Sequence, residues 1–516
     1  MYPGTWALST PDKLALVMVS PTGGIGRTLT YAELDERSLR LANRLRDSGL
    51  RPGDVVALLS DNTPETYEVY WAALRSGLYI TAVNHNLSAG ETSYIVRDCG
   101  AKALVVSAAK ADLVAALDID VAERLAYGGQ VPGYGDYESA LAGAGTVPLP
   151  EQPHGDDLLY SSGTTGRPKG IKLPLPDYAV DEPGYKYIAI FGGLYGFDTS
   201  TVYLSPAPVY HAAPLRFGGV IHATGGTLGM MEKFAPEAFL AAVAELGVTH
   251  TQMVPTMFVR LLKLDDAVRA SYDVSTLRCV VHAAAPCPVE VKRRMIEWLG
   301  PIVQEYYAST EANGATMISS EQWLAHPGSV GVPLIGVPHV CAEDGRELAA
   351  GEVGTLYFER EEFEGASFEY HNDPAKTAST QHPDHPNWTT VGDLGYLDTE
   401  GFLYLTDRKA FMIISGGVNI YPQEIEDLFS LHPAVLDIAV IGVPDDDMGE
   451  RVVAFVQPAL GDTTALAEEL TAFARERIAH YKVPTEIHFR AELPRTPTGK
   501  MVKGKLRDEY VATLAG

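Results

Sequence analysis

A segment rich in glycine and hydroxyl side chains is the strongest chemical signal in the sequence: Tyr160-Ser161-Ser162-Gly163-Thr164-Thr165-Gly166-Arg167-Pro168-Lys169-Gly170. Its glycines permit backbone turns with positive φ, which can point successive N–H groups into a concave nest for an anion. The serines and threonines add hydroxyl donors, and Lys169 adds a cation. The segment does not fit the G-x4-G-K-[ST] pattern of a Walker A loop. We therefore expect a polyphosphate-binding loop of another type, and not the flexible linker that such a composition often forms.

Three later segments carry side chains suited to the rest of a nucleotide. They are Tyr306-Tyr307-Ala308-Ser309-Thr310-Glu311, then Gly392-Asp393-Leu394-Gly395 with Asp407-Arg408 after it, and Pro494-Arg495-Thr496-Pro497-Thr498-Gly499-Lys500. Tyr307 offers a flat face for an adenine, although a core aromatic fits that residue equally well. Glu311 is a carboxylate of the kind that Mg²⁺ takes together with phosphate oxygens. Asp393 can accept from both hydroxyls of a ribose, and Arg408 can hold ribose or phosphate.

In this order, the four segments resemble the AMP-forming adenylating family of acyl-CoA synthetases, luciferases and stand-alone adenylation domains. The resemblance covers nearly the whole chain. It implies a ligase that joins a carboxylic acid to AMP, releases pyrophosphate, and passes the acyl group to the thiol of CoA, so that ATP, Mg²⁺ and CoA are the implied cofactors and co-substrates. The alanines at 283–285, His211 and the aromatic stretch after residue 177 indicate a hydrophobic acid: a fatty, aryl or steroid side-chain acid. The alternatives are an enzyme that loads a carrier protein, a luciferase-like enzyme that uses the adenylate, and an inactive relative that senses a nucleotide or acyl ligand.

The resemblance also implies a role for individual residues. The implied catalytic residues are Lys500, Thr165, Glu311 and His211, with Lys500 bridging the acyl carboxylate and the α-phosphate. The residues implied to bind ATP or AMP are Ser161, Ser162, Gly163, Thr164, Thr165, Gly166, Lys169, Ala283, Ala284, Ala285, Tyr307, Thr310, Asp393 and Arg408. Glu311 is the implied magnesium ligand. Ser415, Gly416 and Gly417 would line the tunnel through which CoA reaches the acyl group.

The acid side of the site is less well defined by the sequence. Tyr210-His211 resembles the aromatic/histidine gate that the family has beside the acyl pocket, and a packed histidine is the alternative. After the phosphate loop the family often has a helix that begins near a histidine, whereas this chain has Lys172-Leu173-Pro174-Leu175-Pro176. A tyrosine-rich stretch follows, with Tyr178, Tyr185, Tyr187 and Tyr195. We expect either an acyl pocket or lid there, or a local variation of the surface.

The elements that must position these residues alternate between helix and strand. Thr30 with Glu33, and Ser88 with Glu91, have the spacing of a capping box, which predicts a helix after each pair. Apolar runs predict buried strands at residues 55–59, 79–83 and 103–106. The same alternation returns at residues 201–204, 236–246, 250–254, 279–282 and 289–298. This pattern predicts an α/β fold of sheets covered by helices, with a small β-rich subdomain around residues 345–360 and 395–405.

A domain boundary is expected near residue 407. Residues 1–406 would form a large domain that binds ATP and the acyl group. Residues 407–516 would form a small, mobile α+β domain with a helix at 422–431, a strand at 435–440 and a helix near 466–478. This domain would carry the adenylation lysine and the CoA-tunnel loop. The family usually reads D-R-x-K-D at the hinge, where this chain has Asp407-Arg408-Lys409-Ala410-Phe411, so the hinge is expected at Lys409 or Ala410.

Composition limits the remaining possibilities. The chain has 516 residues, of which 46% are hydrophobic, so it can bury large cores and is not intrinsically disordered. Its net charge of −26 argues against a nucleic-acid partner, which would require clustered lysine and arginine. Free thiols are expected at Cys99, Cys279, Cys287 and Cys341. With no secretory leader and no apolar run of about 18 residues, a cytoplasmic protein without a transmembrane segment is expected. A homodimer is compatible with the sequence.

Overall fold

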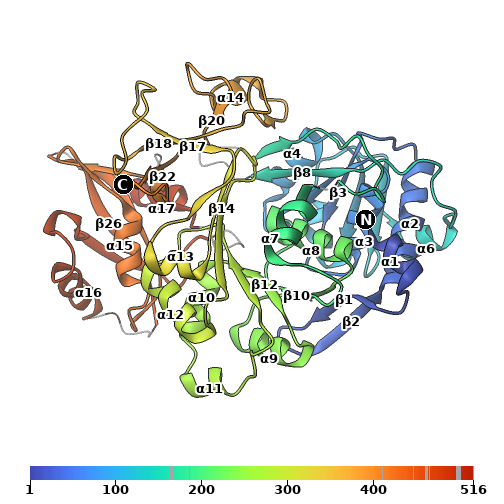
Figure 1. Ribbon diagram of the computed structural model, residues 1–516, viewed down its shortest axis with the longest axis horizontal. Helices are drawn as coiled ribbons and strands as arrows, with labels where there is room; N and C mark the ends of the chain where they lie inside the picture. Colours follow the sequence, from blue (N-terminus) through green and yellow to red (C-terminus); the bar gives the residue numbers. More distant parts are fainter. Residues whose placement is uncertain are drawn as a thin grey trace. The chain divides into compact units, whose positions relative to one another are not determined.

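The computed structural model describes residues 1–161, 168–184, 186–408, 411–445, 447–459, 463, 465–495 and 501–514, with only the backbone of Asp407, Arg408 and Leu514. By their contacts the residues form two compact units (Figure 1). Unit 1 comprises Met1–Met253, Leu264–Val280 and Phe368–Thr377, and unit 2 comprises Val254–Lys263, Val281–Ser367 and Ala378–Gly516.

One sheet of unit 1 carries the start of the predicted phosphate loop. Its strands run in the order β19-β9-β8-β4-β3-β5-β6-β7. In that order they are Glu369–Tyr370, Lys169–Lys172, Asp156–Ser161, Tyr79–Val83, Val55–Leu59, Ala101–Ser107, Glu123–Tyr127 and Gly135–Asp136. β3 pairs in parallel with β4 and β5, and β4 pairs in parallel with β8. The predicted strands at 55–59 and 79–83 are therefore confirmed, and the strand at 103–106 lies within β5.

The helices of unit 1 include those that the capping boxes predict. The Thr30 hydroxyl accepts from the N–H of Glu33, whose carboxylate accepts from the N–H of Thr30, and α2 begins at the next residue. Ser88 and Glu91 make the same pair of bonds at the start of α4. The helices are α1 Pro3–Ser9, α2 Tyr31–Asp47, α3 Glu65–Leu74, α4 Ala89–Asp98, η1 Ala108–Lys110, α5 Ala111–Ala115, α6 Tyr137–Gly143, η2 Ile188–Gly192, α7 Gly193–Tyr195, α8 Ala212–Thr224, α9 Pro236–Leu246 and α11 Asp266–Ala270.

A second set of strands in unit 1 holds α8 in place. These strands lie in the order β12-β10-β11-β1-β2 and are His250–Met253, Val202–Ser205, Thr227–Met231, Leu14–Val19 and Ile25–Thr30. α8 lies against α3 at two glycines. A Cβ at Gly219 would stand 2.6 Å from the hydroxyl of Tyr70, and one at Gly218 would overlap the ring of Tyr67. Only glycine permits so close an approach of the two helices.

The first part of unit 2 is built from antiparallel strands and three helices. β13 (Cys279–His282) crosses the division between the units, and β14 (Val303–Ala308) pairs with β15 (Ala315–Ile318), which pairs with β16 (Val332–Ile335). The β-rich subdomain is confirmed as a sheet in the order β17-β18-β21-β22 with β20 beside β18. Its strands are Val337–Cys341, Gly354–Glu359, Asp393–Leu397, Leu403–Arg408 and Trp388–Thr389. The helices here are α10 Pro255–Leu262, α12 Val289–Leu299 and α13 Ser320–Ala325. α14 (Pro374–Ala378) belongs to unit 1 except for its last residue.

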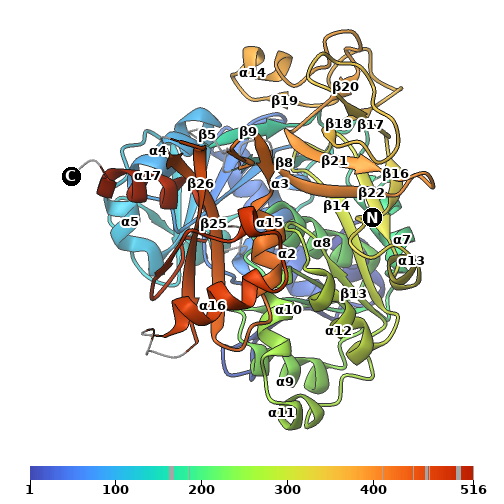
Figure 2. The same ribbon diagram turned by 90° about the vertical axis from the view of Figure 1, so that its left-hand side faces the viewer.

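The C-terminal part of unit 2 has its own sheet, in the order β24-β23-β26-β25, with β27 beside β26. The helix α15 packs on β25 (Figure 2). These strands are Val418–Ile420, Ile413–Ser415, Gly449–Pro458, Val435–Asp445 and Glu486–Phe489, and the helices are α15 Pro422–Phe429, α16 Leu466–Arg475, η3 His480–Lys482 and α17 Lys503–Leu514. The helix, strand and helix predicted after residue 420 are present, and the boundary at residue 407 stays a prediction.

Taken element by element, the predicted α/β class is confirmed. The cysteines at positions 99, 279, 287 and 341 are free, as expected. In the described part of the chain, no helix combines the length and the apolar character needed to cross a membrane.

Candidate active site

The two strands that flank the predicted phosphate loop pair with each other. β8 and β9 are antiparallel, and Ser161 stands opposite Lys169 at their open ends. The Lys169 ammonium lies 5.4 Å from the ring centroid of Tyr370, a residue of the neighbouring strand β19. The predicted binding residues Ser162, Gly163, Thr164, Thr165 and Gly166 lie outside the described residues. Both ends of the loop are thus held together by two neighbouring strands of one sheet, which fixes where the loop begins and ends.

The predicted gate at Tyr210-His211 is held by polar side chains from two other loops. The Asn86 amide donates to the Tyr210 hydroxyl at 3.2 Å, and the rings of His85 and Tyr210 meet edge to face at 5.2 Å. Asn62 accepts from the N–H of Val209 at 3.0 Å, and so holds the segment before the gate. Burial lowers the pKa of His85, which favours its neutral form. Sequence reasoning missed these three residues, because their link to the gate is a long-range contact.

His211 occupies the N-cap position of α8, and its ring lies 4.5 Å from that of Tyr210. The tyrosine-rich stretch comes close to the same helix. Tyr187 and Tyr195 are buried, and the ring between them, Phe191, stacks on Phe217 of α8 at 4.7 Å. These rings therefore form an aromatic cluster beside α8. Tyr178 is half-buried, and Tyr185 lies outside the described residues.

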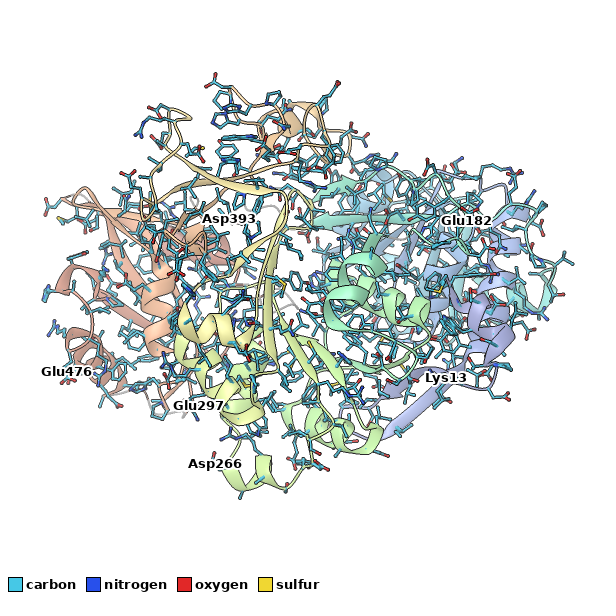
Figure 3. All side chains as sticks on the ribbon, viewed as in Figure 1. Lys13, Glu182, Asp266, Glu297, Asp393 and Glu476 are labelled. Carbon is cyan, nitrogen blue, oxygen red and sulfur yellow. The ribbon has the colours of Figure 1, made fainter. Side chains whose placement is uncertain are left out.

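Two residues predicted to bind the nucleoside are in contact in unit 2. The Tyr307 hydroxyl donates to a carboxylate oxygen of Asp393 at 2.6 Å, although 86 positions separate the two residues. Asp393 is labelled in Figure 3. The Tyr307 ring also stacks against Phe358 at 6.2 Å. Asp393 begins β21 and stands opposite Arg408 of β22, whose side chain is not described. An aromatic face and a carboxylate that could bind a ribose thus lie side by side.

Glu311 lies in the turn after β14, and its side chain is largely buried. The next residue, Ala312, has φ +53°, and its carbonyl accepts from Arg360 at 2.9 Å. Thr310 lies in the same turn. A buried carboxylate here fits an Mg²⁺ ion, which usually takes one or two carboxylates and completes its shell with phosphate oxygens and water.

The predicted adenine segment, Ala283, Ala284 and Ala285, follows β13. Ala284 is exposed and has φ +74°, a left-handed conformation that costs a non-glycine residue about 1–2 kcal/mol. Beneath the segment lies a buried ion pair in which the Lys292 ammonium donates to Glu305 at 2.6 Å. A ring nitrogen of His282, the last residue of β13, lies 3.4 Å from the same oxygen. Burial holds the pKa of His282 well below its usual value, so its imidazole is neutral.

The predicted CoA-tunnel residues form a tight hairpin. Ser415 ends β23, and Gly416 and Gly417 connect it to β24 with φ of +57° and +78°. Two consecutive positive φ values are typical of a two-residue type I′ turn, which glycines adopt without strain. The predicted hinge residues Lys409 and Ala410 and the predicted catalytic Lys500 lie outside the described residues. On either side of the Lys500 loop, Arg495 and Met501 face each other in an antiparallel bridge.

The comparisons with known proteins agree with this geometry. The sequence pattern of the AMP-binding enzyme family matches residues 5–362, and that of the AMP-binding enzyme C-terminal domain matches residues 424–500. A feruloyl-CoA synthase from an Amycolatopsis species is 34% identical over 498 residues, which cover 94% of this chain and 94% of the relative.

A second relative and a solved structure extend this agreement. The fatty acid–[acyl-carrier-protein] ligase ScoC of Streptomyces coeruleorubidus is 30% identical over 499 residues, covering 94% of this chain and 92% of the relative. The structure of o-succinylbenzoate CoA synthetase (MenE) from Bacillus subtilis with its acyl-adenylate intermediate matches with a TM-score of 0.78 and 26% identity, covering 98% of this chain and 97% of that one. The chain therefore belongs to the AMP-binding enzyme family, the AMP-forming adenylating enzymes that its motifs resemble, and is an AMP-forming acyl-CoA synthetase.

Proposed function

We propose that this synthetase activates a hydrophobic carboxylic acid, with an aryl acid as the leading candidate, and transfers it to CoA. The observation that carries the nucleotide half of the proposal is the contact between Tyr307 and Asp393. It sets a flat ring and a ribose-binding carboxylate side by side, as the binding of an adenosine requires. The aryl preference is supported by the aromatic cluster beside α8 and by the feruloyl-CoA synthase among the relatives.

In the first step, a carboxylate oxygen of the acid attacks the α-phosphorus of ATP, and the bond to pyrophosphate breaks. The loop between Ser161 and Lys169 would hold the phosphates with its N–H groups and its cation, and Lys500 would neutralise the two anions that approach each other. Mg²⁺ would be held by Glu311, with Thr310 beside it, and would supply further neutralisation of phosphate charge. Ala283, Ala284 and Ala285 would let the adenine lie against the backbone.

In the second step, the sulfur of CoA attacks the acyl carbon, and the bond to AMP breaks. The hairpin of Ser415, Gly416 and Gly417 would lie beside the extended thiol arm. We propose that residues 407–516 rotate between the steps about a hinge at Lys409 or Ala410, so that one site serves both reactions. We further propose a cytoplasmic enzyme, with a homodimer as its assembly.

Acid-dependent exchange of labelled pyrophosphate into ATP tests the first step. The panel would contain ferulic, cinnamic, benzoic and decanoic acids, each with and without Mg²⁺. We expect exchange with at least one aryl acid and its loss without the metal. Exchange with decanoic acid alone would contradict the aryl preference, and no exchange with any of them would contradict the hydrophobic acid.

The acceptor requires a separate measurement. With CoA present, the product should be an acyl-CoA thioester together with AMP in equal amounts. The carrier-protein ligase among the relatives makes an acyl carrier protein the second candidate acceptor. Exchange of pyrophosphate without any CoA thioester, and acylation of a carrier protein instead, would favour that candidate.

A further inference from the structure

A buried network of charged side chains joins the start of β8 to α8. Arg216 of α8 donates from Nε and Nη2 to the two carboxylate oxygens of Asp157, at 2.8 and 2.7 Å. The two side chains are 8% and 2% exposed. A bidentate arginine–carboxylate pair fixes the relative orientation of its partners as well as their distance. Water does not compete with it at this depth.

A second ion pair ties the aromatic cluster to the same strand end. Lys186 donates to Asp156 at 2.9 Å, and Asp156 is 1% exposed. The Tyr187 ring lies against both cations, with its centroid 4.8 Å from the Arg216 guanidinium carbon and 5.0 Å from the Lys186 ammonium. Burial raises the pKa of Asp156, and the neighbouring Lys186 acts in the opposite direction. The network therefore connects three segments: β8, the residues around Tyr187, and α8.

Asp157 and Arg216 each lie on an element that also carries a residue of the proposed active site. Asp157 lies four residues before Ser161 on β8, a distance of about 13 Å along a strand. Arg216 lies five residues after His211 on α8, about 7.5 Å along a helix axis. β8 is a regular strand and α8 is a regular helix that is also packed on α3. The ion pair therefore sets the position of Tyr210 and His211 relative to Ser161, where β8 enters the phosphate loop.

We propose that Asp157 and Arg216 are positioning residues for acid recognition: their ion pair sets the placement of Tyr210 and His211 relative to the strand of the phosphate loop. The inference rests on the proposed acid site at Tyr210-His211. Neither residue need touch the acid. A displacement of α8 changes the space beside the gate, so acids of different size or shape lose different amounts of activity.

The test is the ratio of kcat/KM for two acids, measured by pyrophosphate exchange with the two best acids of the panel above. This ratio does not depend on the fraction of folded enzyme, so a merely structural role would not change it. Arg216→Lys keeps the charge but loses the bidentate geometry. We expect the ratio to change about fivefold or more. Asp157→Glu keeps both charges and lengthens one side chain, and it should also change the ratio. It replaces Arg216→Lys as the test if that variant does not fold.

Arg37→Lys is the matched control. Arg37 of α2 donates to Glu68 at 2.7 Å and to Glu138 at 2.6 Å, and neither of these partners belongs to the network at Asp157. In Arg37→Lys, the ratio of kcat/KM for the two acids should stay within about twofold of the wild-type ratio. An unchanged ratio in Arg216→Lys and Asp157→Glu, or an equal change in Arg37→Lys, would overturn the proposal. Failure of the proposed function is distinguishable, since the wild type would then show no acid-dependent exchange at all.

Discussion

The buried pair of Lys292 and Glu305 allows a prediction whose size follows from the structure. The Lys292 side chain is 0% exposed and that of Glu305 is 7% exposed, with 2.6 Å between their charged atoms. The Lys292 ammonium also lies 5.0 Å from the ring centroid of Trp323. Lys292→Met keeps an unbranched side chain of similar length but leaves a carboxylate buried without its cation. Removing one partner of a buried ion pair typically costs about 3–5 kcal/mol. We therefore expect the free energy of unfolding of this variant to fall by about that amount at pH 8.

The same variant should show a characteristic pH dependence. Burial already raises the pKa of Glu305, and Lys292 opposes that rise. Without Lys292 the folded-state pKa climbs further above the unfolded value of about 4.3, so the folded protein holds a proton that the unfolded chain has released. Stability relative to the wild type should then fall as pH rises, by up to about 1.4 kcal/mol per pH unit, and should be least affected near pH 5.

Urea unfolding followed by circular dichroism at pH 5, 6, 7 and 8 would measure this difference. The control is the double variant Lys292→Met/Glu305→Met, in which neither of these two positions carries a charge. It should recover most of the lost stability and lose the pH dependence, because well-packed apolar replacements of a buried pair are often close to neutral. Equal losses in the single and double variants at every pH would refute the reasoning.

Three further predictions concern the proposed active site. Tyr307→Phe removes the hydroxyl that holds Asp393 and should raise KM for ATP about tenfold in pyrophosphate exchange, since a hydrogen bond to a charged group contributes about 1.5–3 kcal/mol. The change in KM for the acid should be smaller. Equal changes in the two KM values would count against a nucleoside role. Lys500→Ala should abolish adenylation while a preformed acyl-adenylate still reacts with CoA, and equal loss in both half-reactions would contradict its assigned role. Gly416→Ala should slow thioester formation from the acyl-adenylate and leave pyrophosphate exchange intact. The hairpin holds this residue at φ +57°, which a Cβ disfavours, and the new Cβ would stand 2.5 Å from the methyl carbon of Met448. Unchanged thioester formation would exclude the hairpin from the CoA step.

Local signals account for the parts of the fold that were predictable. The capping boxes at Thr30 and Ser88 fix the first residue of α2 and α4, because the cap satisfies N–H groups that only a helix start leaves open. The run Val55–Leu59 is a strand because it is short, apolar and bounded by turn residues. The order of the motifs identified the family, since each motif is contiguous in the sequence.

The unpredicted features depend on contacts between distant residues. α8 is buried on every side from Pro214 to Thr224, Arg216 and His222 included, so it has no exposed polar face and hydrophobic periodicity does not mark it. Asn62 and Asn86 hold the gate from loops more than 100 positions away. The pairing of Arg216 with Asp157 spans 59 positions, and nothing local to either residue selects that partner. The positive φ of Ala284 likewise breaks the local preference of an alanine.

Gly218 and Gly219 of α8 also limit where the chain can be mutated to change the range of carboxylic acids that the enzyme accepts. Any side chain at Gly218 or Gly219 must displace the tyrosines of α3, so a library randomised over the whole helix would consist largely of misfolded members. Diversity placed instead at Phe191 of η2, which is only partly buried, would vary the aromatic cluster without a change in α8, whereas Phe217 is fully buried. The close packing of α8 on α3 thus directs variation to the segment that precedes α8, and away from the buried positions of α8 itself.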